Sequence, residues 1–360
     1  MSQLPVKEHQ YIQTMQEFND LTHRRFNILT GEWVLVSPHR TKRPWQGRNE
    51  EFIEFPKITY DKNCYLCPGN TRANGEENPF YKKPFAFTND FSALLENIPR
   101  HIYKNGLLRG DSETGICRVV CFSPHHSMTL SLMNIKDIEE VINVWIKEFR
   151  WLGQKDDINY VQIFENKGSV MGCSNPHPHG QIWAQFSIPE EIKKKTKHQK
   201  EYWETHRKSL LFAYLEQELE LKERIIFEDD HFAVLVPYWA IWPYEAMILP
   251  KRKVATIDQL TRDEIASFAK SIKKLTTKYD NIFKTSFPYS AGIHQAPTNG
   301  NVHEEWHMHM SFYPPLLRSS TVKKFMVGYE MFAAPQRDIT AEQAAQTIRE
   351  QSEVHYSNSL

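Results

Sequence analysis

The chain has 360 residues, of which 40% are hydrophobic and 24% charged, a composition typical of a globular protein with enough length for about two domains. Lys plus Arg and Asp plus Glu number 44 each, so the total charge favours neither nucleic acid nor a membrane as a partner. The N-terminal segment has no apolar stretch of signal-peptide length, and the most apolar segment, FAVLVPYWAIW, is too short to span a bilayer. We therefore expect a cytoplasmic protein.

Five cysteines are present, an odd number that suits a reducing compartment better than a disulfide framework. Cys64 and Cys67 form a C-x-x-C motif, which is typical of a redox pair, half of a zinc site or two buried thiols. Zinc needs two further ligands, and the histidine strings at 125–126 and 177–179 can supply one each. No thioredoxin-like pattern surrounds the motif, so the sequence favours zinc.

The middle of the chain alternates between helical and strand-like patterns. Residues 137–150 place Ile138, Val141, Ile142, Trp145 and Phe149 on one apolar stripe, which predicts an amphipathic helix. A strand-like YVQIFEN, a loop containing glycine and the string HPHGQIWAQF follow.

A similar order of patterns occurs again further along the chain. Thr261 and Glu264 form a T-x-x-E capping box ahead of a second amphipathic run, which PYSAGIHQAP and HMHMSFY follow. Each half thus ends in alternating histidines. We interpret this order as an internal duplication with halves near 22–195 and 196–345, both α+β with antiparallel strands.

The string GCSNPHPHGQIW carries the strongest chemical signal. In an extended segment His177, His179 and Gln181 share one face. The two prolines restrict the stretch to an edge or irregular strand, which predicts accessible histidines. A neutral imidazole is a good nucleophile toward phosphorus, and the amides of Gly172 to Ser174 can bind phosphate oxygens. H-P-H alone would favour a polar surface turn, but the full string favours catalysis.

Other polar groups are weaker candidates. The guanidinium groups of Arg40 and Arg43 match phosphate oxygens, although a surface basic patch is equally compatible with them. Asn89, Asp90 and Asn166 have groups that can hydrogen-bond a ribose or base, but such residues are more often found in turns. The basic run KKKTKHQK favours a solvated helix face over a nucleic-acid footprint. Walker, Rossmann and G-x-S-x-G motifs are missing from the sequence.

Together these strings resemble galactose-1-phosphate uridylyltransferase of the histidine-triad superfamily. The resemblance covers roughly 22–350, and it is carried by HRRFN, LVSPHRTKRPWQG, CYLCPGN, FTNDF, VQIFENKG, MGCSNPHPHGQIWA, PYWAIWPYE, KKLTTKYDN, FPYS, YPPLLRSSTVKKFMVGYE and QRDIT. It implies an α+β fold in which two histidine-triad-like repeats form a mainly antiparallel half-barrel flanked by helices. Only the first repeat keeps the catalytic string.

The resemblance also implies a reaction and a set of residue roles. UDP-glucose uridylylates His179 and releases glucose 1-phosphate, then galactose 1-phosphate attacks to give UDP-galactose, and the enzyme is a homodimer with sites completed across the interface. Ser174 and Gln181 match positions that contact the reacting phosphoryl group. The remaining matched positions bind phosphates (Arg40, Arg43), the nucleotide (Ala73, Asn89, Asp90, Asn166, Gly172, Cys173) and the hexose (Lys324, Phe325, Val327, Tyr329, Glu330, Gln336).

Zinc in bacterial relatives is held at positions matching Cys64, Cys67, His126 and His177, although the neighbouring His125 is an alternative ligand. Some relatives carry a second metal, for which His294 and His309 match two ligand positions. The other two positions hold Ser311 and a lysine near Lys195, and we expect this site to be absent or weakened, with His307 as a partial substitute.

Two other functions remain open at this stage. A nucleotide phosphorylase or hydrolase of the same superfamily would use phosphate or water as acceptor, but hydrolytic relatives usually carry a third histidine where Gln181 stands. A non-catalytic, zinc-bound interaction protein would make His179 incidental. Formation of a covalent adduct with UDP-glucose distinguishes these alternatives from the transferase.

Overall fold

The structure is a computed structural model that describes residues 15–42 and 58–358. Its α-helices are α1 (Met15–Asp20), α2 (Ile135–Gly153), α3 (Glu190–His206), α4 (Leu210–Leu221), α5 (Arg262–Ile282), α6 (Tyr329–Phe332) and α7 (Ala341–Arg349). Short 3-10 helices are η1 (Pro38–Lys42), η2 (Ser169–Met171), η3 (Ile257–Gln259) and η4 (Tyr356–Asn358). No helix in the described ranges has the length and apolar character needed to cross a membrane.

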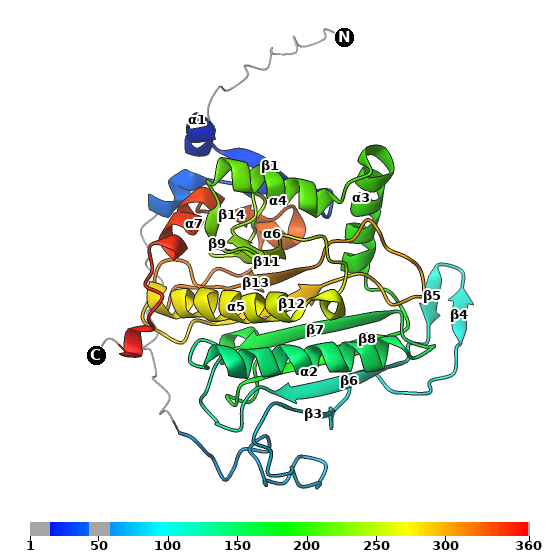
Figure 1. Cartoon of the computed structure of the whole chain (residues 1–360). Coiled ribbons are helices and arrows are strands. Elements are labelled where there is room, and N and C mark those ends of the chain that lie inside the picture. Colours follow the sequence, from blue (N-terminus) through cyan, green and yellow to red (C-terminus); the bar gives the residue numbers. More distant parts are fainter. Residues whose placement is uncertain (1–14, 43–57, 359–360) are drawn as a thin grey trace.

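Within the described residues the strands form three sheets (Figure 1). The nine-stranded sheet has the order β3-β6-β8-β7-β12-β13-β11-β10-β9, and the smaller sheets are β1-β2-β14 and the hairpin β4-β5. The strand bounds are β1 His23–Asn27, β2 Glu32–Val36, β3 Phe85–Thr88, β4 Ile102–Asn105, β5 Leu108–Asp111, β6 Gly115–Cys121, β7 Tyr160–Lys167, β8 His179–Gln185, β9 Ile225–Glu228, β10 Phe232–Leu235, β11 Ala246–Pro250, β12 Tyr289–His294, β13 His309–Tyr313 and β14 Gln336–Arg337.

The large sheet contains the same unit twice. In the first half β3 and β6 precede α2, and β7 and β8 follow it; in the second half β10 and β11 precede α5, and β12 and β13 follow it. The sheet order β3-β6-β8-β7 is mirrored by β12-β13-β11-β10, and β7 pairs with β12 antiparallel at the centre. The topology confirms the α+β class and contains the repeated unit that a duplication predicts, while the bounds of the two halves stay a prediction. His179 and His309 are the first residues of the equivalent strands β8 and β13.

Both predicted helices form, and each begins with a side-chain cap. Asn134 caps α2, and Thr261 and Glu264 make the expected capping box on α5. The two helices lie side by side over the sheet (Figure 1). Their apolar stripes and one face of the sheet form the main hydrophobic core, which includes Ile138, Trp145 and Phe268.

The opposite face of the sheet differs between the halves. Over β10 and β11, α4 and part of the β1-β2 hairpin close a second apolar core that contains Leu211, Leu235 and Val34. Along β8 the side chains alternate, with His179 and Gln181 half-buried on one face and Ile182 buried on the other. In β13, by contrast, His309 and Ser311 are buried as well as Met310. The first half therefore keeps a polar, partly open surface.

Two local expectations were wrong. Of the two predicted forms, an edge or irregular strand, the edge is wrong: Pro176 and Pro178 lie in an irregular segment, and β8 begins after both and lies between β6 and β7 inside the sheet. His177 is fully buried and not accessible. The basic run lies within α3, where most of its lysines face solvent as expected, but Lys195 is only 4% exposed.

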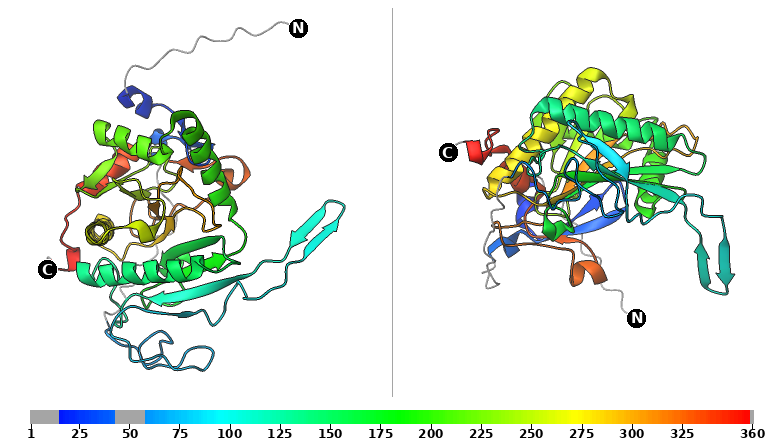
Figure 2. Two further views of the ribbon diagram at one scale, coloured as in Figure 1. Left: turned by 45° about the vertical axis from the view of Figure 1, so that its right-hand side comes forward. Right: turned by 90° about the horizontal axis from the view of Figure 1, so that it is seen from below.

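The hairpin β4-β5 extends away from the body of the molecule (Figure 2). Every residue of both strands is exposed, and Ile102 and Leu107 have exposed fractions of 87% and 97%. A second exposed apolar group, which includes Met331 and Phe332, lies on α6. Isolated two-stranded hairpins are only marginally stable in water.

Candidate active site

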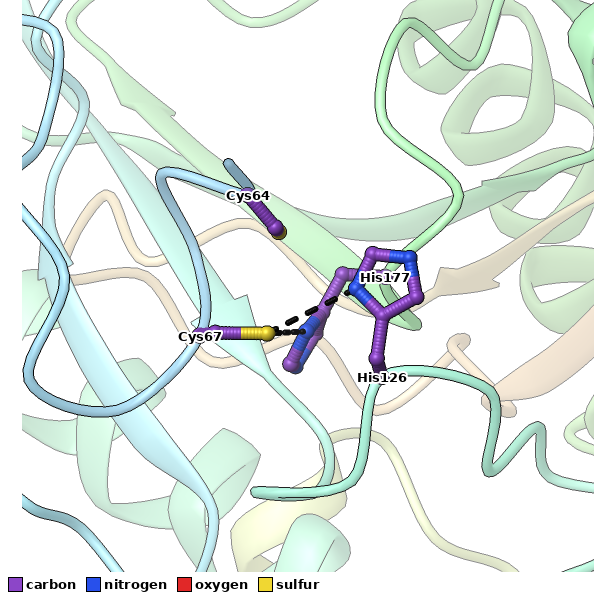
Figure 3. Close-up of side chains that lie close together, drawn as sticks. All are labelled: Cys64, Cys67, His126 and His177. Carbon is purple, nitrogen blue, oxygen red and sulfur yellow. Dashed lines mark hydrogen bonds between the residues drawn. The ribbon is translucent and has the colours of Figure 1, made fainter. Parts of the chain in front are cut away.

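Four potential metal ligands from three segments converge beside the first half of the sheet (Figure 3). The ligand atoms of Cys64, Cys67, His126 and His177 all lie within 4.8 Å of one another. The Cys67 sulfur is 3.5 Å from Nδ1 of both histidines. His125 is exposed and does not join the cluster. The structure thus resolves the choice between the two neighbouring histidines in favour of His126.

The surroundings orient these ligands for a cation. The Ser123 carbonyl lies 2.8 Å from His177 Nε2 and can only accept, so Nε2 carries the proton and Nδ1 presents its lone pair to the cluster. Asn175 accepts a hydrogen bond from the His177 amide at 2.9 Å, and its own amide nitrogen lies 3.5 Å from the Cys64 sulfur. Such outer contacts are typical of metal centres.

Burial shifts the ionisation of the cluster. It raises the pKa of Cys67 to about 11 and lowers the pKa of His177 to about 4, because neither thiolate nor imidazolium is well solvated there. The histidine is therefore a neutral donor at pH 7, whereas the thiolate needs a nearby positive charge. The Cys2His2 set and its spacing fit one tetrahedral divalent ion, and these residues are a candidate metal-binding site.

A polar pocket lies next to this cluster. Its lining combines the start of β8, the end of β7 and the loop between them, and consists of Asn166, Gly172, Cys173, Ser174, His179, Gly180 and Gln181. The structure therefore brings together every residue that the sequence proposed in the catalytic string, apart from His177. The His177 side chain points instead into the metal-ligand cluster (Figure 3).

The orientation of His179 is fixed by the backbone two residues before it. Its Nδ1 lies 2.8 Å from the His177 carbonyl oxygen, so Nδ1 carries the proton and donates. Nε2 then has the free lone pair. Burial lowers the pKa of His179 below its ordinary value, and the imidazole is neutral at pH 7. This is the state that a nucleophile requires.

Other residues that line this pocket can donate hydrogen bonds into it. Gln181 accepts a bond from Trp183 Nε1 at 2.9 Å through its side-chain oxygen, which leaves the amide NH2 of Gln181 to donate into the pocket. Gly172 has a φ of 81°, a left-handed conformation that favours glycine, at the turn that leads to Cys173 and Ser174. Backbone amides and a hydroxyl at such a turn can bind anionic oxygens.

The residues proposed for the nucleotide are spread over two places. Asn166 lies in the pocket, and its side-chain oxygen accepts a bond from Ser290 at 2.7 Å. Asn89 and Asp90 follow β3, where Asp90 lies 3.9 Å from Arg72, the neighbour of Ala73. Arg72 was missed because a single arginine in a loop has no sequence signal; it connects the Ala73 segment to Asp90.

A second pocket contains most of the proposed hexose residues together with one of the proposed phosphate ligands. It is lined by Leu35, Ser37, Arg40, Lys324, Val327, Tyr329, Glu330 and Gln336. Arg40 is held by Asp338 at 3.0 Å, and Lys324 is paired with Glu330. Phe325 packs against Trp242 and does not line this pocket, and Arg43 falls outside the described residues.

The two pockets have no lining residue in common. Arg40 therefore lies with the proposed hexose-binding residues of its own chain and apart from His179.

At the equivalent place in the second half, a lysine stands beside two histidines. His294 and His309 are paired across β12 and β13, and their rings stack with centroids 4.8 Å apart. Lys195 Nζ reaches to 3.4 Å from His309 Nε2. His307 is engaged elsewhere, because Val254 N–H donates to its Nδ1 and its Nε2 contacts the Pro250 carbonyl.

Comparisons with known proteins agree with this architecture. The N-terminal domain of galactose-1-phosphate uridyl transferase matches residues 13–189 and the C-terminal domain of that family matches 190–360. A galactose-1-phosphate uridylyltransferase from Haemophilus influenzae is 55% identical over 93% of this chain and 95% of its own length. The Saccharomyces cerevisiae protein of that name is 45% identical over 96% and 98%. A solved uridylyltransferase structure superposes with a TM-score of 0.72 at 25% identity, covering 91% of this chain and 97% of that one.

The duplicated sheet with one histidine-bearing polar face defines a protein built from two copies of one α+β unit. Within that class, the chain belongs to the galactose-1-phosphate uridyl transferase family, whose members are transferases.

Gly180 provides a test of how tightly His179 is positioned. A Cβ at this residue would lie 2.8 Å from the Phe122 ring and 2.9 Å from the Phe164 carbonyl oxygen. We expect Gly180→Ala to push β8 from β7 and to lower the free energy of unfolding by about 1–3 kcal/mol, the usual cost of overpacking. Denaturant unfolding measures this. Gly110→Ala, whose Cβ meets nothing within 4 Å, is the matched control. Equal stabilities of the two variants would contradict the packing argument.

Proposed function

We propose that this chain transfers a uridylyl group from UDP-glucose to galactose 1-phosphate through a covalent bond to His179. The observation that carries the proposal is the contact of Nδ1 with the His177 carbonyl. This contact leaves the lone pair of Nε2 free, in a pocket whose lining residues can donate hydrogen bonds. The names of the related proteins support galactose 1-phosphate as a substrate and uridylyl as the group transferred, and UDP-glucose as the donor is our inference. We infer that the roles given to Ser174, Gln181 and the nucleotide-binding residues by matching position hold in this chain.

The proposed reaction has two balanced steps. In the first, Nε2 forms a bond to the α-phosphorus of UDP-glucose, and the bond from that phosphorus to the bridging oxygen breaks, so glucose 1-phosphate leaves with the electron pair. In the second, a phosphate oxygen of galactose 1-phosphate attacks the same phosphorus, and the P–N bond breaks. The Nδ1 proton stays on the imidazole, where the His177 carbonyl stabilises the positive charge of the intermediate. Gln181 and the Ser174 loop stabilise the phosphoryl oxygens.

We also propose that the working form is a homodimer. Arg40 and the hexose residues share a pocket that contains no residue of the His179 pocket, which supports a site whose sugar half comes from a partner subunit. The exposed apolar side chains of β4-β5 and α6 provide surface for such an association. Sedimentation equilibrium at micromolar concentration should give twice the chain mass; a monomer with full activity would exclude this arrangement.

The nucleophile is tested by mass spectrometry. We expect UDP-glucose alone to add one uridylyl group to the protein, with release of glucose 1-phosphate and ping-pong exchange kinetics. His179→Ala should lose the adduct and several orders of magnitude of activity, because no other group takes over the covalent step.

His125→Ala is the matched control, since His125 is an exposed histidine outside the pocket. An adduct at full yield in His179→Ala would assign the nucleophile to another residue. Release of free UMP without an acceptor, at the rate of transfer, would favour a hydrolase, and a protein that forms no adduct would favour the non-catalytic alternative.

We propose that the Cys2His2 cluster holds one structural zinc ion. Zinc accepts this ligand set in tetrahedral geometry, and its charge would stabilise the buried Cys67 thiolate. The ion would lie next to the site of uridylyl transfer and would take no part in the reaction. Its contribution is to fix the segment at His177, whose backbone carbonyl in turn holds the His179 ring.

Removal of a metal ligand should therefore affect both stability and transfer. We expect about one zinc ion per chain in the wild type. In Cys67→Ser the zinc affinity should fall by more than the roughly 10–100-fold that is typical when a hydrogen bond to a metal ligand is lost. The melting temperature should fall with it. Because thiolates bind the metal, apparent affinity should also fall as the pH is lowered. Pure wild-type protein that contains no zinc, with Cys64 and Cys67 oxidised to a disulfide, would contradict the assignment.

The second metal site of some relatives does not fit the residues of this chain. We infer that the Lys195 ammonium takes the position of the cation, since it lies 3.4 Å from His309 Nε2. Burial lowers the pKa of Lys195 to about 8, so the amine is still mostly protonated at pH 7. A neighbouring positive charge disfavours a divalent ion at His294 and His309. His307, whose two ring nitrogens face backbone groups, is not a replacement ligand.

Exchange of the lysine for a carboxylate tests this inference. We expect Lys195→Glu to raise the metal content from about one to about two ions per chain, because a carboxylate beside two neutral imidazoles completes a set of ligands. Elemental analysis after dialysis against zinc or iron measures the content. Lys193→Glu, an exposed position on the same helix, should change nothing. A wild type that already binds two ions, one of them lost in His309→Ala, would refute the inference.

A further inference from the structure

A buried cluster of charged and polar groups lies on the helix side of the sheet, behind the pocket. Its members, the Asp280 cluster, are Ser131, Lys167, Asp280 and His355, and each is at most 7% exposed. They come from the loop before α2, the end of β7, α5 and the C-terminal segment. The cluster therefore joins four parts of the chain that are distant in sequence.

Asp280 is the centre of this cluster. Its Oδ1 accepts from Lys167 Nζ at 2.9 Å and from the Phe287 amide at 2.7 Å. Its Oδ2 accepts from Ser131 Oγ at 2.5 Å and from His355 Nε2 at 3.2 Å. Although burial opposes ionisation, Lys167 and the other donors hold the pKa of Asp280 below its ordinary value. The carboxylate is charged and fully hydrogen-bonded.

His355 contributes from a segment that makes no contact with the pocket. The Ser357 amide donates to His355 Nδ1 at 3.2 Å, so the proton of the ring is on Nε2 and points to Asp280. Asn281 holds the same segment by donating to the Ser352 and Val354 carbonyls, both at 2.9 Å. The C-terminal end lies beside the end of α5 (Figure 1).

The other end of the cluster reaches the active site through β7. Lys167 is the last residue of this strand and Asn166, one residue earlier, faces the opposite side and lines the pocket. Gly168 follows with a φ of 89°, and the chain then turns through η2 to Gly172, Cys173 and Ser174. A side chain that anchors Lys167 thus fixes the point from which the phosphate-binding loop begins.

We propose that Lys167, Asp280 and His355 are positioning residues for uridylyl transfer, and that the C-terminal segment 350–358 keeps Asn166 and the 168–174 loop in their binding geometry. The inference rests on the proposed function, because it assigns the pocket to the nucleotide. None of the three lines the His179 pocket. Their effect is on how well the nucleotide is held.

The test removes one donor and then restores it. His355→Leu deletes the bond to Asp280, whereas His355→Gln keeps an amide donor. Hydrogen exchange of the 168–174 amides, calorimetric binding of UMP and the steady-state constants are measured well below the melting temperature. We expect faster exchange in 168–174, and about tenfold weaker UMP binding with a matching rise in KM for UDP-glucose and a smaller change in kcat. His355→Gln should restore most of each.

Two further variants complete the design. Glu353 lies on the C-terminal segment, and Glu353→Ala breaks its ion pair with Lys274 of α5. This variant should leave all readouts unchanged, because Glu353 is exposed and lies outside the cluster. Asn281→Ala loosens the segment without removing a member of the cluster, and it decides the question if His355→Leu fails to fold. It should shift exchange and UMP binding in the same direction.

The outcomes separate this inference from the proposed function. His355→Leu could lower the melting temperature and leave hydrogen exchange in 168–174 unchanged, with UMP binding and KM within twofold of wild type. That result would show that the cluster only stabilises the fold, and it would overturn the inference. Failure of the wild type to form the His179 adduct would overturn the proposed function instead. In that case the hydrogen-exchange measurement still shows whether the Asp280 cluster affects the 168–174 loop.

Discussion

The proposed active site depends on one short connection, the hydrogen bond from His179 Nδ1 to the carbonyl oxygen of His177. The same residue 177 sends its side chain into the metal-ligand cluster, so the group that orients the proposed nucleophile is itself fixed by the cluster. A proline separates the two histidines, which limits the backbone freedom between them. The proposed metal ligand and the proposed nucleophile therefore lie within three residues of one another. This short connection keeps the His179 ring in one tautomer and one orientation, which a nucleophile requires.

The duplicated fold explains why only one half has this surface. Both halves bury one face of their strands under α2 or α5. On the other face, α4 and the β1-β2 hairpin cover the second half, whereas in the first half the Cys64–Cys67 segment covers β3 and β6 and leaves β8 partly exposed. Where both faces are buried, a polar group must be satisfied within the protein. Where one face is open, His179 and Gln181 can meet a substrate. The asymmetry of the covering elements therefore determines which repeat is available for catalysis.

Much of this was accessible from the sequence. The capping box at Thr261 and the Cys64–Cys67 motif were readable because each is a local pattern with a direct physical cause. The burial of Lys195 was not, because a run of lysines predicts solvent exposure and only the packing of α3 against β13 decides otherwise. Arg72 and the placement of Arg40 beside Lys324 depend on contacts between distant segments, which no spacing encodes.

His179 and His309 illustrate how equal positions acquire different chemistry. Both begin the inner strand of a repeat, and in both the Nδ1 atom faces the carbonyl oxygen two residues earlier, at 2.8 and 3.4 Å. Nε2 of the first opens into a pocket, whereas Nε2 of the second faces the Lys195 ammonium. A lone pair that already accepts a proton donor is not free to attack phosphorus or bind a metal. The covering elements and the buried lysine together distinguish the surroundings of His309 from those of His179, while the backbone contact of the imidazole stays the same.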